Sequence, residues 1–334
     1  MKKAAVFGAG SFGTAVAQVL SANFDEVVLW GRDAALVEAI TVKHENPGYL
    51  PNLPLSPRVR GSTDVKQAAT DAQLIVVAIP SQAAREFLKG GHQYFPALVP
   101  IVTVAKGIEN ESLSTMTEVL EQSLPEAFSP HIAVLSGPSF AREMMQRLPT
   151  VVTVASRFEK TAREVQGLFS SEFFRTYTST DVVGVQVGGA LKNVIAIAAG
   201  MSDGMGLGHN SRAAIITRGL AEISRIAVRM GGNPLTLSGL AGMGDLVLTC
   251  TGELSRNRTV GFQLGQGKSM AEIMKGLKQV AEGVKTAKSA VDLAAKYGVE
   301  LPICQQVHAI AWEGKNPRQA LSELMTRAPK SEIV

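Results

Sequence analysis

A glycine-rich turn that directly follows a short apolar run is the feature that most constrains this chain. Residues 3–7 read as a buried strand, GAGSFG follows at residues 8–13, and a helical segment comes next. In such a unit Gly8 makes the tight turn, Gly10 lets the backbone approach a pyrophosphate, and Gly13 lets helix and strand pack closely. The free N–H groups at the helix N-terminus favour the diphosphate. The segment predicts a dinucleotide-binding βαβ unit, with a plain strand–loop–helix turn as the alternative.

The end of the second strand, residues 27–30, bears on the choice of cofactor. Enzymes confined to NAD carry an acidic residue there that holds the ribose 2′-hydroxyl. Here the sequence continues with Gly31, Arg32 and Asp33, so a guanidinium stands near the acidic position. A guanidinium pairs well with a 2′-phosphate, which favours NADPH over NADH. The alternative is that Arg32 is a solvated loop residue and Asp33 takes the acidic role.

Composition narrows the class of protein. The chain has 334 residues, 46% of them hydrophobic, which is enough for two domains. The net charge is only +4, and the absence of a dense basic run argues against nucleic acid as a partner. We expect a small-molecule substrate, and the mild positive balance suits a phosphorylated one. The oligomeric state stays open, a homodimer included.

We expect no targeting segment, membrane span or metal site. The first 22 residues look superficially like a secretory signal, but their removal would delete the glycine-rich turn. No run approaches the roughly 18 apolar residues of a membrane span, so we expect a cytoplasmic protein. Cys250 and Cys304 are too few and too far apart for a disulfide framework or a zinc site, and the histidines have no metal-ligand spacing.

The first half of the chain alternates strands with helices, which predicts an α/β fold with a Rossmann-type doubly wound sheet. A proline-rich segment at residues 46–54 is expected to be a loop. Further strands are expected at residues 74–79, 101–105 and 132–135. Two more, at residues 151–155 and 175–178, are expected on either side of a helix near residues 159–169. Ligands bind outside the carboxyl ends of such strands. The polar segments at residues 80–81, 106–107 and 136–139 should therefore converge on one cleft, although residues 80–81 also fit an ordinary turn.

Beyond about residue 188 the apolar residues recur at helical spacing, as in Ile216, Leu220 and Ile223. We therefore expect a dinucleotide-binding domain over residues 1–188 and an all-helical C-terminal, substrate-binding domain over residues 189–334. The glycine-rich residues 203–208 follow no strand and are expected to join two helices.

Three polar clusters stand out in the helical half. Lys192 lies in an otherwise apolar helix, Asp245 follows a run of small residues, and SRNR at residues 255–258 has the groups expected around a phosphate. Each has a plain structural alternative: a lysine that reaches solvent, a helix cap and a solvated basic turn.

Taken together, these segments resemble the bacterial-type NAD(P)-dependent glycerol-3-phosphate dehydrogenases over essentially the whole chain. The resemblance lies in the order and joint presence of motifs in both halves. They are GAGSFG (8–13), KGIE (106–109), SGPSFARE (136–143), LKNV (191–194), GMSDG (200–204), GMGDL (242–246) and SRN (255–257).

The resemblance implies reversible reduction of dihydroxyacetone phosphate to sn-glycerol 3-phosphate, a precursor of glycerophospholipids, with Lys192 as the acid/base. Besides the glycines of the turn, it implies cofactor contacts at Ser11, Phe12, Arg32, Lys106, Ala141, Arg256, Val280 and Glu282. The substrate contacts that it implies are Lys106, Gly137, Ser139, Lys192, Asp245, Ser255, Arg256 and Asn257.

The chemistry of ketone reduction is consistent with these roles. Negative charge grows on the ketone oxygen as hydride arrives, and a nearby ammonium can stabilise that charge and donate the proton. Desolvation and neighbouring cations, here Lys106 and Arg256, lower the pKa of a lysine. Asp245 could orient Lys192 or a substrate hydroxyl. Two rivals stay open: a dehydrogenase for 6-phosphogluconate or pantoate, and a non-catalytic nucleotide sensor.

Overall fold

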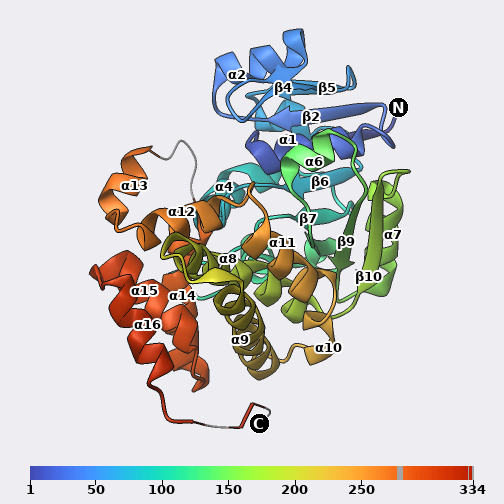
Figure 1. Ribbon diagram of the computed structural model, residues 1–334. Coiled ribbons are helices and arrows are strands. Elements are labelled where there is room, and N and C mark those ends of the chain that lie inside the picture. Colours follow the sequence, from blue (N-terminus) through green and yellow to red (C-terminus); the bar gives the residue numbers. More distant parts are fainter. Residues whose placement is uncertain (277–280, 330, 333–334) are drawn as a thin grey trace.

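The computed structural model describes residues 1–276, 281–329 and 331–332 (Figure 1). A sheet with its covering helices occupies the N-terminal half, and a group of helices occupies the C-terminal half. The predicted α/β domain followed by a helical region is confirmed.

Within the described residues, eight strands form one sheet in the order β10-β9-β8-β7-β6-β1-β2-β5. Neighbouring strands are parallel except β8 and β9, which are antiparallel, a pairing that the sequence did not indicate. The strands are β1 (Lys3–Phe7), β2 (Glu26–Trp30), β5 (Val59–Ser62), β6 (Leu74–Val77), β7 (Ile101–Thr103), β8 (Ile132–Ser136), β9 (Thr150–Ala155) and β10 (Phe174–Ser179).

Both faces of the sheet are buried, which explains the continuous apolar runs of its strands. Alternate residues of β1 enter different cores: Val6 packs in one cluster and Phe7 in the other. The helices and helical turns of this half are α1 (Ser11–Leu20), α2 (Ala34–Glu38), η1 (Ala39–Lys43), α3 (Val65–Ala69), η2 (Ser81–Ala83), α4 (Ala84–Gly91), η3 (His92–Tyr94), α5 (Met116–Ser123), η4 (Glu126–His131), α6 (Ala141–Met145) and α7 (Glu159–Phe169).

The segment predicted as a loop at residues 46–54 is instead part of a small antiparallel ribbon, β3 (Glu45–Asn46) with β4 (Leu50–Pro54). The prediction was wrong because proline is excluded only from central strands. In a ribbon of two strands, Pro51 and Pro54 can lie where no ladder hydrogen bond is needed. The ribbon rests on the glycine-rich turn, because Asn46 Nδ2 donates to the Ala9 carbonyl at 3.0 Å.

The described elements of the C-terminal half are all helical. A long helix, α8, runs through its centre and is buried almost throughout. Glycine-rich residues 203–208 join α8 to α9, as predicted. The elements are α8 (Val182–Gly204), α9 (Gly208–Arg229), α10 (Pro234–Leu237), η5 (Leu240–Gly244), α11 (Asp245–Thr251), α12 (Arg256–Gly265), α13 (Met270–Gly276), α14 (Glu282–Tyr297), α15 (Pro302–Glu313) and α16 (Pro317–Met325).

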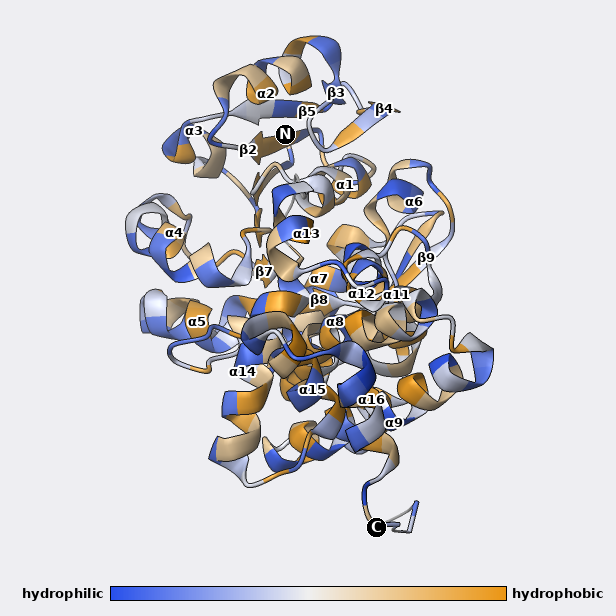
Figure 2. Ribbon diagram, turned by 60° about the vertical axis from the view of Figure 1, so that its left-hand side comes forward, coloured by the Kyte–Doolittle hydropathy of each residue, from blue (hydrophilic) through white to orange (hydrophobic). Residues whose placement is uncertain are grey.

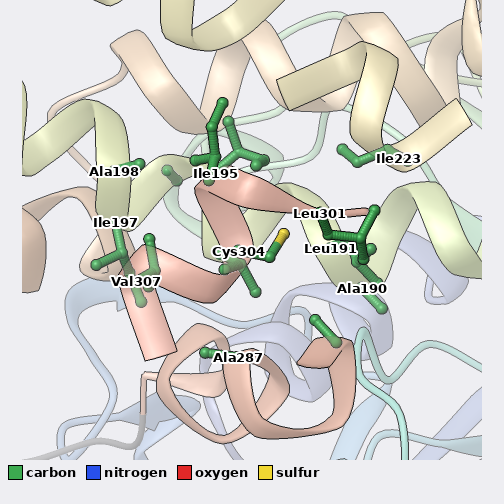
Figure 3. Close-up of a cluster of buried hydrophobic side chains, with 14 of the residues drawn as sticks. Ala190, Leu191, Ile195, Ile197, Ala198, Ile223, Ala287, Leu301, Cys304 and Val307 are labelled. Atoms are coloured by element: carbon green, nitrogen blue, oxygen red, sulfur yellow. The ribbon is translucent and has the colours of Figure 1, made fainter. Parts of the chain in front are cut away.

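The core of this half gathers around α8. Figure 3 shows Leu191 and Ile195 of α8 among side chains that include Cys304 and Val307 of α15. In Figure 2 the central strands β2 and β7 carry hydrophobic colour, whereas the outer helices mix hydrophobic and hydrophilic residues. The sequence analysis expected no segment of membrane-spanning length, but among the described residues α8 is the one helix long and apolar enough to cross a membrane. Of its apolar window, 94% is buried inside the protein.

Glycines let the backbones of α12 and α8 come into direct contact. This packing positions Lys192 and the N-terminus of α12 relative to each other. A Cβ added at Gly200 would lie 2.0 Å from the Arg258 carbonyl oxygen, and one at Gly261 would lie 2.0 Å from that of Ile197. Any larger residue would push the helices apart. The contact fixes the N-terminus of α12 relative to Lys192, which lies on α8.

Candidate active site

A cavity of about 1040 Å³ lies between the glycine-rich turn and the helices α8 and α12. Three of the predicted strand-end segments converge there, through Pro80, Lys106 and Ser139. Gly137 and Asp245 do not line it, and Val280 lies outside the described residues. The predicted site residues in its wall are Gly8, Gly10, Ser11, Phe12, Gly13, Arg32, Lys106, Ser139, Ala141, Lys192, Ser255, Arg256, Asn257 and Glu282.

The geometry of the three glycines in the turn fits the separate roles that the sequence predicts. Gly8 has φ +120°, and an added Cβ would lie 2.5 Å from the Ala78 carbonyl oxygen. A Cβ at Gly13 would lie 1.9 Å from the carbonyl oxygen of Gly8, whereas one at Gly10 would meet no atom within 4 Å. Gly8 and Gly13 thus shape the turn, and Gly10 leaves its backbone open to a ligand. This arrangement fits a dinucleotide diphosphate at the N-terminus of α1.

Arg32 and Asp33 have different environments at the end of β2. Asp33 Oδ1 accepts hydrogen bonds from the backbone N–H groups of Ala35 and Leu36, at 3.0 and 3.2 Å, and so caps α2. Arg32 is exposed in the wall of the cavity, and in the described part of the chain its guanidinium has no hydrogen bond or ion pair. Arg32 is therefore available to a ligand, while the Asp33 carboxylate already has a structural role.

Two lysines from different halves of the chain share one buried carboxylate. Lys106 follows β7, and its Nζ donates to Asp245 Oδ2 at 2.8 Å and to the Gly137 carbonyl at 3.0 Å. Lys192 Nζ donates to Asp245 Oδ1 and, at 2.8 Å, to Thr249 Oγ1. Asp245 is only 1% exposed. The three predicted residues are thus brought together, and Asp245 reaches the cavity through the lysines that it holds.

Burial dominates the electrostatics of Lys192. Removal of its ammonium from water lowers its pKa to about 7, and the nearby charge of Lys106 acts in the same direction. Asp245 opposes this shift because it stabilises the charged form. A lysine with such a pKa can donate or accept a proton near neutral pH.

Thr249 was missed by the sequence analysis. Its Oγ1 donates to the Asp245 carbonyl at 2.6 Å and accepts from Lys192. Asp245 and Thr249 are four residues apart on α11, and such positions share a helix face. The spacing is therefore a usable signal once Asp245 is assigned to the site.

The cluster at residues 255–258 divides between structural and cavity-facing roles. Ser255 caps α12, accepting from the backbone N–H of Arg258 at 3.2 Å. Arg256 lines the cavity, where burial lowers its pKa and the charge of Glu282 partly compensates. Arg258 turns away and pairs with Asp203 at 2.7 Å. Of the two arginines in this cluster, Arg256 is thus the one that lines the cavity.

Asn257 lines the cavity but also ties three helices together. Its Nδ2 donates to Asn193 Oδ1 at 2.9 Å, and its Oδ1 accepts from the backbone N–H of Gly283 at 3.0 Å. These bonds join α12 to α8 and α14. One donor and one acceptor site of this amide are therefore committed within the protein.

Gly137 and Ser139 support Lys106 from the end of β8. Gly137 has φ +146°, and a Cβ there would lie 2.9 Å from Val152 Cα. Its carbonyl accepts from Lys106 and from Ser139 Oγ, the latter at 2.8 Å. Gly137 therefore positions a cavity residue from behind the wall. Among the described residues, no group of three or more His, Cys, Asp or Glu side chains could hold a metal ion.

Comparison with known proteins covers both halves of the chain. Models for the N-terminus and the C-terminus of NAD-dependent glycerol-3-phosphate dehydrogenase match residues 3–162 and 181–322. A glycerol-3-phosphate dehydrogenase [NAD(P)+] of Myxococcus xanthus is 62% identical over 99% of each chain. That of Bacillus subtilis is 46% identical over 100% of this chain and 96% of its own length.

The solved structures agree with these matches. A glycerol-3-phosphate dehydrogenase from Coxiella burnetii superposes with a TM-score of 0.92 at 37% identity, over 98% of this chain and 99% of its own. A ketopantoate reductase of Ralstonia eutropha has a TM-score of 0.58 at 16% identity, over 97% and 100% of the two chains, and shares the fold alone.

Proposed function

The chain belongs to the family of NAD-dependent glycerol-3-phosphate dehydrogenases, and on that basis we propose that it reversibly reduces dihydroxyacetone phosphate to sn-glycerol 3-phosphate with NADPH or NADH. The observation that carries the proposal is the pair of ammonium groups on Asp245, beside a cavity that extends from the glycine-rich turn to Arg256. The expected cytoplasmic location and the supply of glycerophospholipid synthesis are part of the proposal and rest on the sequence.

The cavity suggests a division of labour between the two halves. Residues 1–188 would hold the cofactor at the glycine-rich turn, with Arg32 and Ala141 beside it. Residues 189–334 would hold the substrate phosphate near Arg256, at the N-terminus of α12, where the helix dipole favours an anion. Helix α8 begins at Val182 and spans the boundary between these parts. When bound, the reduced nicotinamide supplies the hydride for the ketone carbon.

In this proposal Lys192 donates its Nζ proton to the ketone oxygen during reduction and accepts one from the alcohol during oxidation. Lys106 places a second positive charge near the oxygen as negative charge develops there. Because Asp245 is bonded to both lysines, it keeps Lys106 as a partner when Lys192 becomes neutral. The carboxylate is therefore never left buried and unpaired, which would be costly.

The test is to follow nicotinamide absorbance with dihydroxyacetone phosphate and either NADPH or NADH. We expect turnover with this substrate and none of comparable efficiency with ketopantoate or in the oxidation of 6-phosphogluconate. Efficient turnover of a rival would reassign the substrate, and cofactor binding without any turnover would favour the nucleotide sensor.

Replacement of Arg32 by alanine is expected to raise the Kd for NADPH and leave that for NADH almost unchanged. A hydrogen bond to a charged group is worth about 1.5–3 kcal/mol, and we expect the low end, about 10-fold, because Arg32 is exposed to solvent. Titration with each cofactor measures the effect. Arg60→Ala, an exposed arginine outside the cavity, is the matched control. Equal losses for both cofactors would rule out pairing with the 2′-phosphate.

The pH dependence should have opposite signs in the two directions. Reduction needs protonated Lys192, so its kcat/KM is expected to fall as pH rises through about 7. Oxidation needs the neutral amine, so its kcat/KM should fall as pH drops through the same value. Rates measured in both directions across that range provide the check. If kcat/KM changed with pH in the same direction for reduction and oxidation, the assignment of the proton transfer to Lys192 would be wrong.

A further inference from the structure

Ser81 makes a hydrogen bond from the sheet half to a carboxylate of the helical half. It follows β6, and its Oγ donates to Oε2 of Glu282, the first residue of α14, at 2.8 Å. Ser81 is fully buried and does not line the cavity, whereas Glu282 does. The sequence analysis accepted residues 80–81 as an ordinary turn, so this contact was not anticipated.

The Ser81–Glu282 bond is covered by the turn after Lys106. A Cβ added at Gly107 would lie 2.4 Å from Ser81 Oγ and 3.2 Å from Glu282 Oε2, so only glycine leaves room for the pair. The Gly107 backbone thus covers the bond. A hydrogen bond in such a shielded position is stronger than one in water, and its loss leaves a buried carboxylate oxygen without that donor.

The backbone at Glu282 is fixed independently from the helical side. The N–H of the next residue, Gly283, donates to Asn257 Oδ1 at 3.0 Å. A Cβ at Gly283 would lie 2.6 Å from the Asn193 carbonyl oxygen, so the start of α14 packs directly on α8. The main chain is therefore set by the helical half, and the orientation of the carboxylate is set by Ser81 in the sheet half.

We propose that Ser81 is a positioning residue that holds the Glu282 carboxylate in the cavity wall as an acceptor for hydroxyl or amide donors of the nicotinamide cofactor. The inference rests on the proposed function and on the cofactor contact that the family resemblance implies for Glu282, which lines the cavity. Ser81 itself touches neither cofactor nor substrate in this arrangement. It links cofactor affinity to the contact between the two halves of the chain.

The charges around Glu282 define a pH signature. Burial raises its pKa, while the Ser81 hydrogen bond, Lys285 on the same helix and Arg256 on α12 oppose that shift. The ammonium of Lys106, in the neighbouring turn, is paired with Asp245. If the ionised carboxylate is the acceptor, cofactor affinity falls as pH drops through the pKa of Glu282. Loss of the Ser81 donor raises that pKa further and moves the fall to higher pH.

The test compares two serine-to-alanine variants in the contact between α14 and the sheet half. Ser81→Ala is expected to raise the Kd for NADPH about 10-fold at neutral pH, as for the loss of a bond to a charged group, with a smaller effect on kcat. The fall in NADPH affinity on acidification should also begin at a higher pH than in the parent. Ser289→Ala is the control, because Ser289 Oγ donates to the Ile108 carbonyl at 3.1 Å in the same contact but lies outside the cavity. Fluorescence titration with NADPH measures Kd without turnover.

Glu282→Gln provides a second, independent variant. It keeps the side-chain shape and an oxygen that can accept from Ser81, but it cannot titrate, so the fall in NADPH affinity on acidification should disappear. In this background Ser81→Ala should cost less than in the parent, because the bond that it removes goes to a neutral oxygen and not to a carboxylate. The proposal would be overturned if Ser81→Ala raised the Kd for NADPH by the same factor in the parent and in Glu282→Gln. It would also be overturned if Ser81→Ala bound NADPH as tightly as Ser289→Ala does. If the parent enzyme did not turn over dihydroxyacetone phosphate but the variants changed the Kd for NADPH as expected, the proposed reaction would be refuted. The role of Ser81 would not be.

Discussion

Lys192→Met is expected to lower kcat at least about 100-fold, the low end of the contribution of general acid–base catalysis, while the protein folds and binds cofactor. Methionine keeps the length and the apolar stem of lysine but has no proton to donate. The carboxylate of Asp245 would retain its bond to Lys106, so the substitution does not leave a buried charge without a partner. The loss should therefore appear in the chemical step.

Stopped-flow turnover, cofactor titration and thermal unfolding together check this prediction. Lys288→Met is the matched control, because Lys288 is exposed on α14 and lies outside the cavity. Near-normal turnover of Lys192→Met would remove the acid/base role from Lys192 and make Lys106 the next candidate. A variant that lost cofactor binding as well would indicate a structural role in the cavity wall.

The sheet half could be read from the sequence because local rules agree there. Buried parallel strands have continuous apolar runs, and the glycine-rich turn has a spacing that few other structures require. Gly8 and Gly13 are needed because an added Cβ would clash with the turn itself or with the end of the adjacent strand. The antiparallel pairing of β9 with β8 was not predicted, because period and composition do not encode strand direction.

The candidate site was harder to assemble, because its parts come from residues far apart in the chain. Lys106, Lys192 and Asp245 were each selected, but their meeting depends on how α8 and α11 pack against the end of β7. Spacing alone carries no information about that packing. The family resemblance supplied the connection, and the structure then showed which side chains touch.

Ser81 and Asn46 illustrate what sequence analysis could not find. Asn46 lies in a proline-rich segment, and the ribbon brings its Nδ2 to the Ala9 carbonyl and to Thr14 Oγ1. Ser81 follows a strand like many turn serines, and Glu282 lies 201 residues later. Both residues act through long-range hydrogen bonds, for which the local sequence has no pattern.

Arg256→Lys is expected to lower kcat/KM for dihydroxyacetone phosphate by up to about 100-fold, the upper range for hydrogen bonds to a charged group. Lysine keeps the charge but loses the planar fork that holds a phosphate through two parallel bonds. Part of the loss should fall on kcat, because binding energy from the remote phosphate positions the ketone for reaction.

The diagnostic measurement for Arg256 uses two substrates that differ only in the phosphate. Unphosphorylated dihydroxyacetone should be a very poor substrate of the parent enzyme, and Arg256→Lys should scarcely worsen it. Arg258→Lys is the matched control, because Arg258 lies on the same helix but pairs with Asp203 outside the cavity wall. If Arg256→Lys lost the same factor on both substrates, the residue would be acting on the fold or the cofactor. A loss confined to the phosphorylated substrate would identify Arg256 as the group that recognises the phosphate, and it would put the substrate at the N-terminus of α12, where the helix dipole adds to the same attraction.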